Sequence, residues 1–354
     1  MTTAAGSVRA RQTSDFTELA KKIQDMGLLR RRYGYYWSKF SLLVGLYIGA
    51  GFLFLAIGES WWQLGLAAAL GLLFTQAAFM GHDAAHRQIF NSGKRNEWAA
   101  LLIANLMVGL SNGWWMNKHG KHHANPNKVD RDPDIEKGIV VFTPEDAAER
   151  TGFAKWFAAR QGWMLFPLLT FEGLNLHVQA ARTVFGRSAV SKRTVEIVLL
   201  TLRFSVLFFA VFWVLPLGMA FAFLGLQFAV FGVYMGACFA PNHKGMPLVP
   251  KELKIDFLRR QTLMSRNISG GYWLAVGMGG LNYQIEHHLF PSMPRPHLRL
   301  VQPIVRQYCA EKKVAYTETT LINSYRIVIR YLNTVGLGQR DPFSCPITQQ
   351  YRSR

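Results

Sequence analysis

Cysteine is scarce in this chain of 354 residues, which contains Cys238, Cys309 and Cys345. A small secreted scaffold held together by disulfides needs many cysteines, so that class is excluded, and we expect three reduced thiols. Charged residues are also few, at 17% of the chain against 50% hydrophobic residues. Such a composition excludes intrinsic disorder and differs from that of average soluble proteins.

Acidic residues are the scarcer charged kind, with 21 against 40 lysines and arginines, which gives a formal net charge of +19 at pH 7. Three kinds of partner fit this charge: nucleic acid, anionic lipid headgroups, and an anionic substrate or redox protein. No nucleic-acid-binding module is recognisable in the sequence, so we expect no nucleic-acid partner.

The basic segment 1–39 lacks the short apolar core and the small-residue cleavage site of a signal peptide. Two long hydrophobic runs follow. In residues 40–81 the only charged residue is Glu59, and the run is long enough for two membrane spans of roughly 20 residues each. Residues 195–240 fit two more spans, interrupted by the Leu-Pro-Leu-Gly sequence at 215–218. The sequence therefore predicts four spans in two hairpins.

The loops inside the two hairpins contain no lysine or arginine, whereas the segments 1–39, 82–194 and 241–354 contain many. The positive-inside rule places these three segments, and with them both chain termini, in the cytoplasm. The shorter apolar stretch 98–115 is expected to be interfacial or re-entrant, because one crossing there would separate the histidines before it from those after it. The predicted fold is thus an all-α integral membrane protein with a cytoplasmic helical cap.

Eight of the ten histidines fall into four short segments at the predicted cytoplasmic ends of the spans. The eight are His82, His86, His119, His122, His123, His243, His287 and His288. Within three of the segments the spacing is helical, at i, i+3 or i+4, so the rings share one helix face. Eight imidazoles without cysteine exceed a four-ligand structural zinc site and suggest two metal ions, and imidazole suits Fe, Zn, Cu and Ni alike. The cap therefore has a predicted dimetal site of open metal identity.

The remaining two histidines are interpreted as ordinary polar or interfacial residues. His177 lies in an apolar helical stretch, and His297 follows an Arg-Pro pair. Arg203 falls inside the predicted third span, where a charge usually faces a cavity or a partner, or snorkels to the membrane surface.

The histidine segments form three boxes, His-X3-His at 82–86, His-X2-His-His at 119–123 and Gln-X2-His-His at 284–288. With Asp-Pro-Asp at 132–134 and His-Leu-Phe-Pro-Ser-Met-Pro-Arg at 288–295, the sequence resembles the integral-membrane fatty acid desaturases over roughly residues 40–306. The glutamine that leads the third box is typical of the front-end branch and its bacterial relatives, which include acyl-CoA and linoleoyl-CoA desaturases.

The resemblance implies a non-haem diiron centre that uses O2 to place a cis double bond in an acyl chain carried by CoA or by a lipid. It assigns the eight histidines as iron ligands. For Gln284, direct coordination, coordination through water and no coordination remain alternatives, and Asn242 is a candidate holder of a metal-bound water. Metal-bound histidines need acceptors for their second nitrogen. The candidate acceptors are Asp83, Asp130, Asp134 and Glu286.

Electron supply and substrate binding are further expectations. The chain has no fused cytochrome b5 domain with its His-Pro-Gly-Gly signature, so we expect a separate ferredoxin or reductase as donor. Aromatic residues for an apolar slot are Trp61, Trp62, Trp114, Trp115, Tyr272 and Trp273, with an ordinary interfacial belt as the alternative. Candidate cations for a CoA headgroup, which would equally suit anionic lipid or an acidic ferredoxin, are Arg182, Arg187, Lys192 and Arg193.

Two other functions are compatible with histidine-rich membrane segments. A diiron lipid hydroxylase or ketolase of the same superfamily would use the same ligands. A metal transporter is the lesser alternative, because it would carry ionisable groups near the middle of its spans, whereas these histidines lie at span ends.

Overall fold

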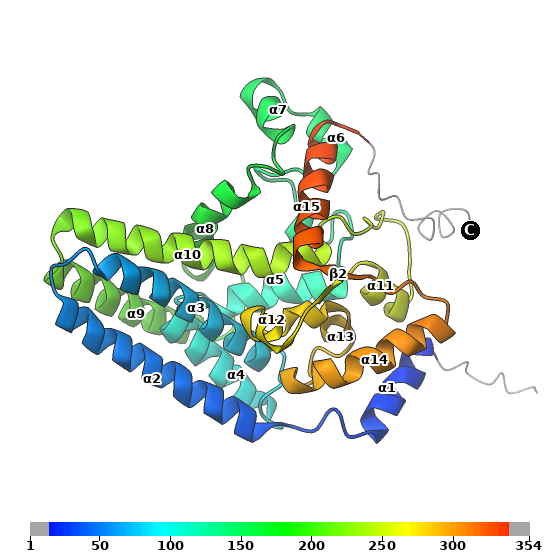
Figure 1. Ribbon diagram of the computed structural model, residues 1–354, viewed down its shortest axis with the longest axis horizontal. Helices are drawn as coiled ribbons and strands as arrows, with labels where there is room; N and C mark the ends of the chain where they lie inside the picture. The colour runs from blue at the N-terminus through cyan, green and yellow to red at the C-terminus, as the bar shows by residue number, and fades with distance from the viewer. Residues whose placement is uncertain (1–13, 340–354) are drawn as a thin grey trace, which may run out of the picture.

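The computed structural model describes residues 14–339, so Cys345 and residues 1–13 lie outside the described part of the chain. Four of its helices are long and apolar enough to cross a membrane, and they lie in one bundle (Figure 1). These are α2 (Tyr33–Ile57), α3 (Gln63–Ala85), α9 (Arg193–Val214) and α10 (Leu217–His243).

The helices extend beyond the hydrophobic runs seen in the sequence. Helix α2 begins at Tyr33, seven residues before the expected start of the span. The sequence did not indicate these first two turns, because they are aromatic and basic and do not form an apolar run. Helices α3 and α10 run on to Ala85 and His243. His82 and His243 are therefore fixed by helices that begin in the apolar bundle.

The stretch 98–115 is not one straight helix. Helix α4 (Gly93–Leu102) continues as a π-helix, η1 (Ile103–Val108), and the chain then bends by 113° before α5 (Asn112–Ala124). Gly109 allows the bend, because its φ of 93° is a left-handed conformation that other residues rarely adopt. This geometry belongs to a broken span or a re-entrant loop.

Helix α8 (Leu165–Phe185) packs closely along α10 through small residues. A β-carbon on Gly173 would lie 2.1 Å from the Phe228 carbonyl oxygen, and one on Gly232 would lie 2.3 Å from the Gly173 nitrogen. The two backbones can approach only because both positions are glycine, which is the usual way helices pack tightly in membranes. The contact fixes α8 beside the carboxyl-terminal half of α10.

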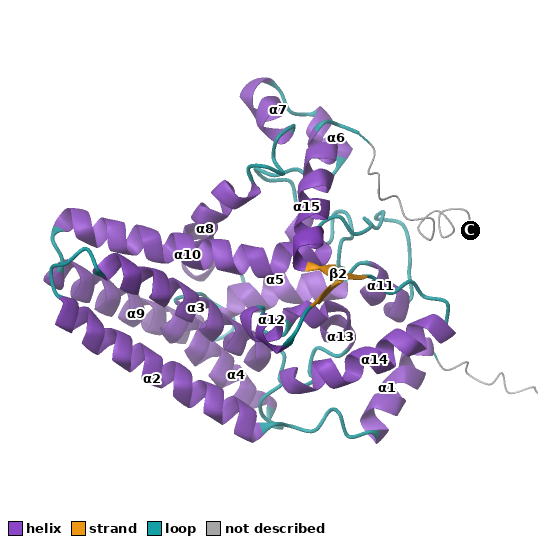
Figure 2. Cartoon of the chain, viewed as in Figure 1, coloured by secondary structure: helices purple, strands orange, loops and turns teal. Residues whose placement is uncertain are grey.

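The other elements form the part of the molecule beyond the bundle, and Figure 2 shows that nearly all are helical. The two short strands pair in parallel, with Asn267 opposite Glu318. The remaining elements are α1 (Asp15–Asp25), η2 (Pro133–Ile135), α6 (Pro144–Ala148), α7 (Gly152–Ala158), α11 (Phe257–Leu263), β1 (Asn267–Ser269), α12 (Tyr272–Gly277), η3 (Leu281–Tyr283), α13 (Gln284–Leu289), α14 (Arg295–Glu311), β2 (Glu318–Thr320) and α15 (Leu321–Gly336).

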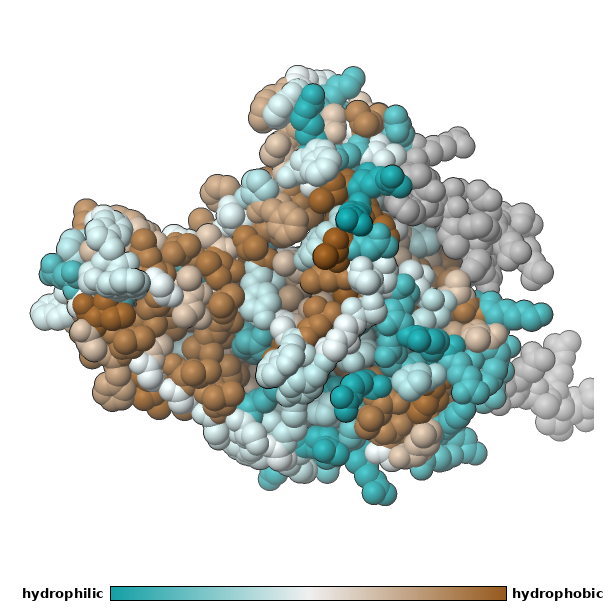
Figure 3. All heavy atoms as spheres, in the orientation of Figure 1, coloured by the Kyte–Doolittle hydropathy of each residue, from teal (hydrophilic) through white to brown (hydrophobic). Residues whose placement is uncertain are grey.

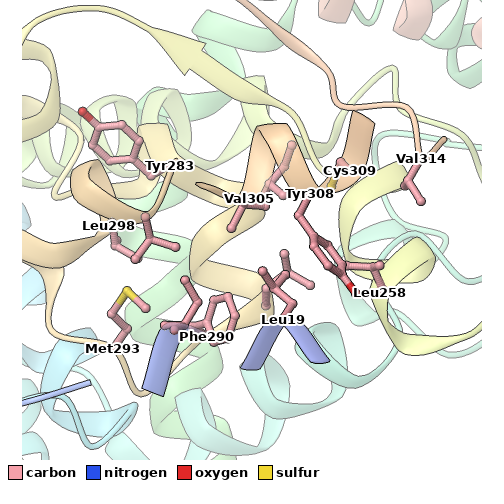
Figure 4. Close-up of a cluster of buried hydrophobic side chains, with 14 of the residues drawn as sticks. Leu19, Leu258, Tyr283, Phe290, Met293, Leu298, Val305, Tyr308, Cys309 and Val314 are labelled. Carbon is pink, nitrogen blue, oxygen red and sulfur yellow. The ribbon is translucent and has the colours of Figure 1, made fainter. Parts of the chain in front are cut away.

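A hydrophobic core outside the bundle holds α13 in place. Leu19 of α1 and Val305 and Tyr308 of α14 pack together there (Figure 4). Leu289 and Phe290, at the end of α13, belong to the same core. Burying each large apolar side chain contributes roughly 1.5–3 kcal/mol, so this core anchors the helix that carries the third histidine box.

The surface is divided along the long axis of the molecule. Figure 3 shows hydrophobic residues over the four long helices and hydrophilic residues gathered at the opposite end. The protein is therefore an integral membrane protein candidate with a polar helical portion outside its apolar bundle.

Candidate metal centre

Eight histidines from four helices converge where the apolar bundle meets the polar portion. The last turn of α3 supplies His82, and His86 follows it as the helix cap. Helix α5 supplies three rings from consecutive turns, α10 supplies its last residue, and α13 supplies two adjacent rings. Segments up to about two hundred residues apart in the sequence thus meet at one place.

Five of the eight rings form one group, which we call the five-histidine set: His82, His86, His119, His123 and His287. The Nε2 atom of His119 is central. It lies 3.2 Å from Nε2 of His82, 2.8 Å from that of His86 and 3.0 Å from that of His123. Nε2 of His287 lies 3.1 Å from Nε2 of His123, which completes the set.

The other three rings, His122, His243 and His288, form the three-histidine set. Nε2 of His122 and Nε2 of His243 are 3.3 Å apart. The ring centroid of His288 lies 4.8 Å from that of His243, and its buried Nε2 has no hydrogen-bond partner within the described residues.

These donor sets fit metal cations. A neutral imidazole carries one N–H, so the three nitrogens around Nε2 of His119 cannot all be satisfied by hydrogen bonds to it. Burial lowers the pKa of His119, His123 and His287 well below the ordinary value, so these rings stay neutral and keep their lone pairs. Converging neutral nitrogen donors of this kind repel one another unless a cation lies between them.

Each ring of the three-histidine set is oriented through its second nitrogen. Nδ1 of His122 lies 3.0 Å from Oδ1 of Asp132, Nδ1 of His288 lies 2.9 Å from Oε1 of Gln261, and Nδ1 of His243 lies 2.9 Å from the Met264 carbonyl oxygen. Burial alone would lower the pKa of His122, but the hydrogen bond that its Nδ1–H donates to Asp132 and the charges of Asp134 and Asp132 outweigh burial and raise that pKa.

The predicted acidic acceptors lie in different surroundings. Asp134 approaches Nδ1 of His122 at 3.4 Å and pairs with Lys118. Asp83 lies 3.6 Å from Nδ1 of His82, while its other oxygen pairs with the buried Arg295 at 2.7 Å. The two acids thus border one histidine set each.

Asp130, another predicted acidic acceptor, lies at the surface. Its side chain is 60% exposed and pairs with Lys251. Its own backbone explains this, because φ at Asp130 is +60° and the chain turns there. Glu286 is buried but accepts hydrogen bonds from Asn267 and Tyr316 rather than from a histidine.

Three acceptors escaped the sequence reasoning: Asp132, Gln261 and the Met264 carbonyl. Asp132 lies in the Asp-Pro-Asp motif quoted above, and that motif was the available signal. It also accepts from the backbone N–H groups of Asn127 and Asp134, which fix its carboxylate toward His122. Gln261 and Met264 carry no local signal, because only the tertiary fold brings them to the histidines.

Gln284 and Asn242 both lie at the three-histidine set. The Gln284 amide nitrogen lies 2.8 Å from Nε2 of His243. Nδ2 of Asn242 donates to the Cys238 carbonyl and to Oε1 of Gln284, and its buried Oδ1 has no partner within the described residues. An amide therefore occupies the position beside His243 where a further imidazole could stand.

A cavity of about 690 Å³ adjoins both sets. His82 and His119 of the five-histidine set line it, as does His243 of the three-histidine set. Most of the rest of the wall is apolar side chains from α3, η1, α8 and α10. Trp115 lines the cavity too and stacks on His119 with a centroid separation of 4.6 Å.

The other aromatic residues of the predicted slot do not line the cavity. Trp61 and Trp62 lie in the connection before α3, roughly 30 Å along that helix from His82. They are strongly exposed, as are Tyr272 and Trp273. Trp114 is half-buried and packs against a neighbouring apolar cluster. The belt interpretation suits the exposed four better than the slot interpretation does.

The predicted headgroup cations lie outside the cavity wall as well, at the end of α8 and the start of α9. Lys192 pairs with Glu97, and Arg193 donates to the carbonyl oxygens of Gly186 and Ser188. Arg182 and Arg187 are not among the described residues that line the cavity.

The residues interpreted as structural have local partners. His177 and His297 are hydrogen-bonded through Nδ1 to the carbonyl oxygens of Gly173 and Leu28, and neither joins a metal-binding group of the described residues. The guanidinium of Arg203 lies over the Phe74 ring at 4.9 Å from its centroid.

An apolar helical bundle, two sets of largely buried imidazoles and a cavity against both define a class, the membrane enzymes with a histidine-rich metal centre. The family described as "Fatty acid desaturase" matches residues 59–320, and the chain belongs to this family. It is an oxidoreductase, as the desaturases are.

Individual relatives that the chain resembles are named as fatty acid desaturases. The Delta(8)-fatty-acid desaturase of Borago officinalis is 27% identical over 342 residues, which cover 93% of this chain and 76% of the relative. The Acyl-lipid (9-3)-desaturase of Borago officinalis is 29% identical, over 77% of this chain and 63% of the relative. The Delta(6)-fatty-acid desaturase fat-3 of Caenorhabditis elegans is 26% identical, over 92% and 76%.

Proposed function

We propose that this desaturase introduces a cis double bond into a fatty acyl chain, using two non-haem iron ions, O2 and two electrons from a separate protein. The eight imidazoles in two sets, six of them buried and two half-buried, both sets bordering one apolar cavity, are the observation that carries the proposal. No side-chain base or nucleophile can break an unactivated methylene C–H bond, so the bound irons with O2 supply the oxidising power.

The protein side chains have three tasks in this proposal. All eight histidines would hold the irons, the three-histidine set one iron and the five-histidine set the other. Gln284 and Asn242 occupy the three-histidine set as a direct or water-mediated contact. Asp132 and Gln261 orient rings of the three-histidine set from outside, because a ring whose second nitrogen is hydrogen-bonded keeps its angle and its basicity.

Positioning of the substrate falls to the cavity wall. His82 and His243 reach the cavity from opposite sets, so a chain threaded along the wall would pass both histidine sets. Trp115 shields His119 by stacking, and the apolar walls keep water away from the site. A cavity of this volume and lining suits a ligand that is largely apolar.

The topology is part of the proposal. Helices α2 with α3 and α9 with α10 would cross the bilayer as two hairpins. The segments 1–39, 82–194 and 241–354 would lie in the cytoplasm with both termini, as the lysine and arginine distribution favours. The 3.2 Å separation of His82 and His119 supports a re-entrant segment between them, because that segment returns to its starting level. The electron donor would then dock from the cytoplasm as a ferredoxin or reductase.

Expression in a host with a ferredoxin and its reductase tests the proposal. New double bonds in the fatty acid methyl esters, and about two irons per purified chain, are expected. A His122→Ala variant present in equal amount in the membrane should form no product, whereas Asp130→Asn should match the wild type. Lipid profiles that are identical for the wild type and His122→Ala would refute an enzymatic role. Monohydroxy acids in place of unsaturation would assign the chain to the hydroxylases.

A further inference from the structure

The last turn of α10 contains a proline, Pro241, which is followed at once by Asn242 and His243. Proline has no backbone N–H, so the carbonyl oxygen four residues before it, on Ala237, has no intrahelical partner. The end of any helix leaves further carbonyl groups without partners. Because a carbonyl group that is removed from water needs a hydrogen bond, the turn that carries His243 must be held from outside the helix.

Helix α15 supplies part of this support, because its first turn lies against the end of α10 (Figure 1). The hydroxyl group of Tyr325 donates to the Ala237 carbonyl oxygen, the one that the proline leaves free. Oγ of Ser324 donates to the Pro241 carbonyl oxygen at 2.8 Å. Two side chains of one neighbouring helix thus replace bonds that α10 cannot make for itself.

The rest of the support comes from Arg266, which is only 1% exposed. Its Nε donates to the Pro241 carbonyl oxygen at 2.9 Å, and its Nη2 donates to that of Lys244 at 3.0 Å. Its backbone N–H donates to the Asn242 carbonyl oxygen at 2.9 Å. One residue therefore engages three carbonyl groups at the end of α10, before and after His243.

A guanidinium group suits this position for two reasons. Carbonyl groups at the carboxyl end of a helix carry partial negative charge, which favours a cation. The planar fork of arginine can reach two carbonyl groups at once, whereas the ammonium group of lysine is a compact point charge. Taking a guanidinium out of water costs free energy unless its donors are hydrogen-bonded. The bonds of Arg266 to the end of α10 therefore account for its burial.

Arg266 belongs to a fully buried segment, residues 261–267, which we call the brace. At its start, Oε1 of Gln261 lies 2.9 Å from Nδ1 of His288 on α13. Nε2 of the same side chain donates to the His123 carbonyl oxygen on α5, also at 2.9 Å. The first residue of the brace thus contacts two of the helices that carry histidines.

The remainder of the brace contacts α10 and α13. The Met264 carbonyl oxygen lies 2.9 Å from Nδ1 of His243 on α10. Oδ1 of Asn267 accepts from the backbone N–H of Ile285, in the first turn of α13, at 2.9 Å. The brace therefore joins α5, α10 and α13, the three helices that supply the three-histidine set.

We infer that Arg266 is a positioning residue for the metal of the three-histidine set. It fixes the backbone on both sides of His243, and Met264 fixes the ring, so Nε2 of that ring is held against the other two rings of the set. Because the set has only three imidazoles, a displaced His243 leaves its metal without enough ligands. The inference rests on the proposed function and names the residue that keeps one half of the centre in place.

Mössbauer spectroscopy of the full-length protein, loaded with isotopically enriched iron, tests this role. Arg266→Lys keeps the charge but loses the fork, so the quadrupole splitting of one of two iron sites should change. A chelator should remove that iron roughly 10- to 100-fold more readily, as for other outer-partner mutations. Arg326→Lys is the matched control at an exposed position of α15 and should match the wild type. Equal iron loss from both sites, or an unchanged spectrum, would overturn the inference.

A milder variant tests the same turn if Arg266→Lys does not accumulate in the membrane. The double variant Ser324→Ala/Tyr325→Phe removes the two bonds from α15 and leaves Arg266 in place. It should change the spectrum of the same iron site, with a smaller loss of iron than Arg266→Lys. Two iron sites identical to those of the wild type would contradict the positioning of His243 by bonds from outside α10.

Amide hydrogen exchange in the metal-free protein reports on the end of α10 without the irons. In Arg266→Lys, amides of residues 238–246 should exchange at least about tenfold faster than in the wild type, while residues 217–230 of the same helix keep their rates. Uniform acceleration along α10 would indicate a general loss of stability and would contradict local positioning.

Failure of this inference differs from failure of the proposed function. A wild type with two irons and desaturated product, beside an Arg266→Lys variant that matches Arg326→Lys, would overturn the role of Arg266 and leave the desaturase function intact. A wild type without iron or product would refute the proposed function. In that case the exchange rates of the metal-free protein would still decide whether Arg266 holds the end of α10.

Discussion

The two histidine sets hold their rings in different ways. In the three-histidine set every Nδ1 has an acceptor, supplied by Asp132, Gln261 and the Met264 carbonyl. In the five-histidine set, Nδ1 of His123 is buried without a partner among the described residues, and Nδ1 of His82 has Asp83 at 3.6 Å. Outer hydrogen bonds orient every ring of the smaller set, whereas at least two rings of the larger set, His82 and His123, have no such bond among the described residues.

This difference predicts how the metal affinity of each set responds to the loss of one histidine. A set with many donors tolerates the loss of one, because four imidazoles still satisfy a metal ion that prefers four or more ligands. A set with three imidazoles and an amide has no spare ligand, so the loss of any ring or of its outer acceptor should lower metal affinity. The predictions below test this contrast, in order of decreasing effect on metal affinity.

Loss of His122 should have the largest effect. His122→Ala leaves two imidazoles in its set, so we expect the metal affinity of that set to fall by more than roughly 100-fold, beyond the range of outer-partner mutations. His86→Ala is the counterpart in the five-histidine set and should lose much less metal. Iron analysis after dialysis against a chelator measures both, and equal losses would contradict the contrast.

Substitution of Asp132 should come next. Asp132→Asn removes the charge that holds His122, so metal affinity of the three-histidine set should fall by roughly 10- to 100-fold. Asp130→Asn is the matched control, because this carboxylate pairs with Lys251 at the surface, where ion pairs contribute little. Chelator titration of both variants provides the measurement, and a similar loss in the two would argue against an orienting role for Asp132.

Gln284→His should strengthen the smaller set. A fourth imidazole beside His243 replaces an amide that lies 2.8 Å from that ring. We expect roughly tenfold tighter iron retention in that set, which corresponds to about 1.4 kcal/mol. The rate of iron loss to a chelator reports it. An unchanged rate would show that the amide position lies outside the coordination sphere.

Asp83→Asn should change metal affinity least, by less than roughly tenfold, because Asp83 is not within hydrogen-bonding distance of His82. Its main partner is the buried Arg295, and an unpaired buried charge costs roughly 3–5 kcal/mol. Thermal unfolding should therefore reveal a clear loss of stability while the folded protein keeps its iron. A large iron loss without destabilisation would reverse this assignment.

Local spacing in the sequence pointed to seven of the eight histidines, and the position of His243 at the end of the fourth predicted span pointed to the eighth. Rings at i, i+3 and i+4 share a helix face, and the ends of apolar helices fix the depth at which they sit. Choosing between Asp130, Asp132 and Asp134 was beyond such reasoning, because only the fold shows that Asp132 and Asp134 approach His122 while Asp130 pairs with Lys251. Gln261 and Met264 reach the site only through the packing of α11.

The start of α2 and the residues that line the cavity also could not be predicted from the sequence. The aromatic and basic turn at Tyr33 has the composition of an interfacial loop, although it is helical. Tryptophan at a membrane interface and tryptophan in a substrate slot have the same sequence signature, so Trp115 could not be separated from Trp62 without the fold.

The glycine contact between α8 and α10 restricts how this enzyme can be redesigned. Larger residues at Gly173 or Gly232 would push the two helices apart, so that wall of the cavity cannot be used to set the length of an accepted chain. Ala78 and Ala104 line the opposite wall on α3 and η1. Engineering for shorter acyl chains should therefore begin with bulkier side chains at these two alanines.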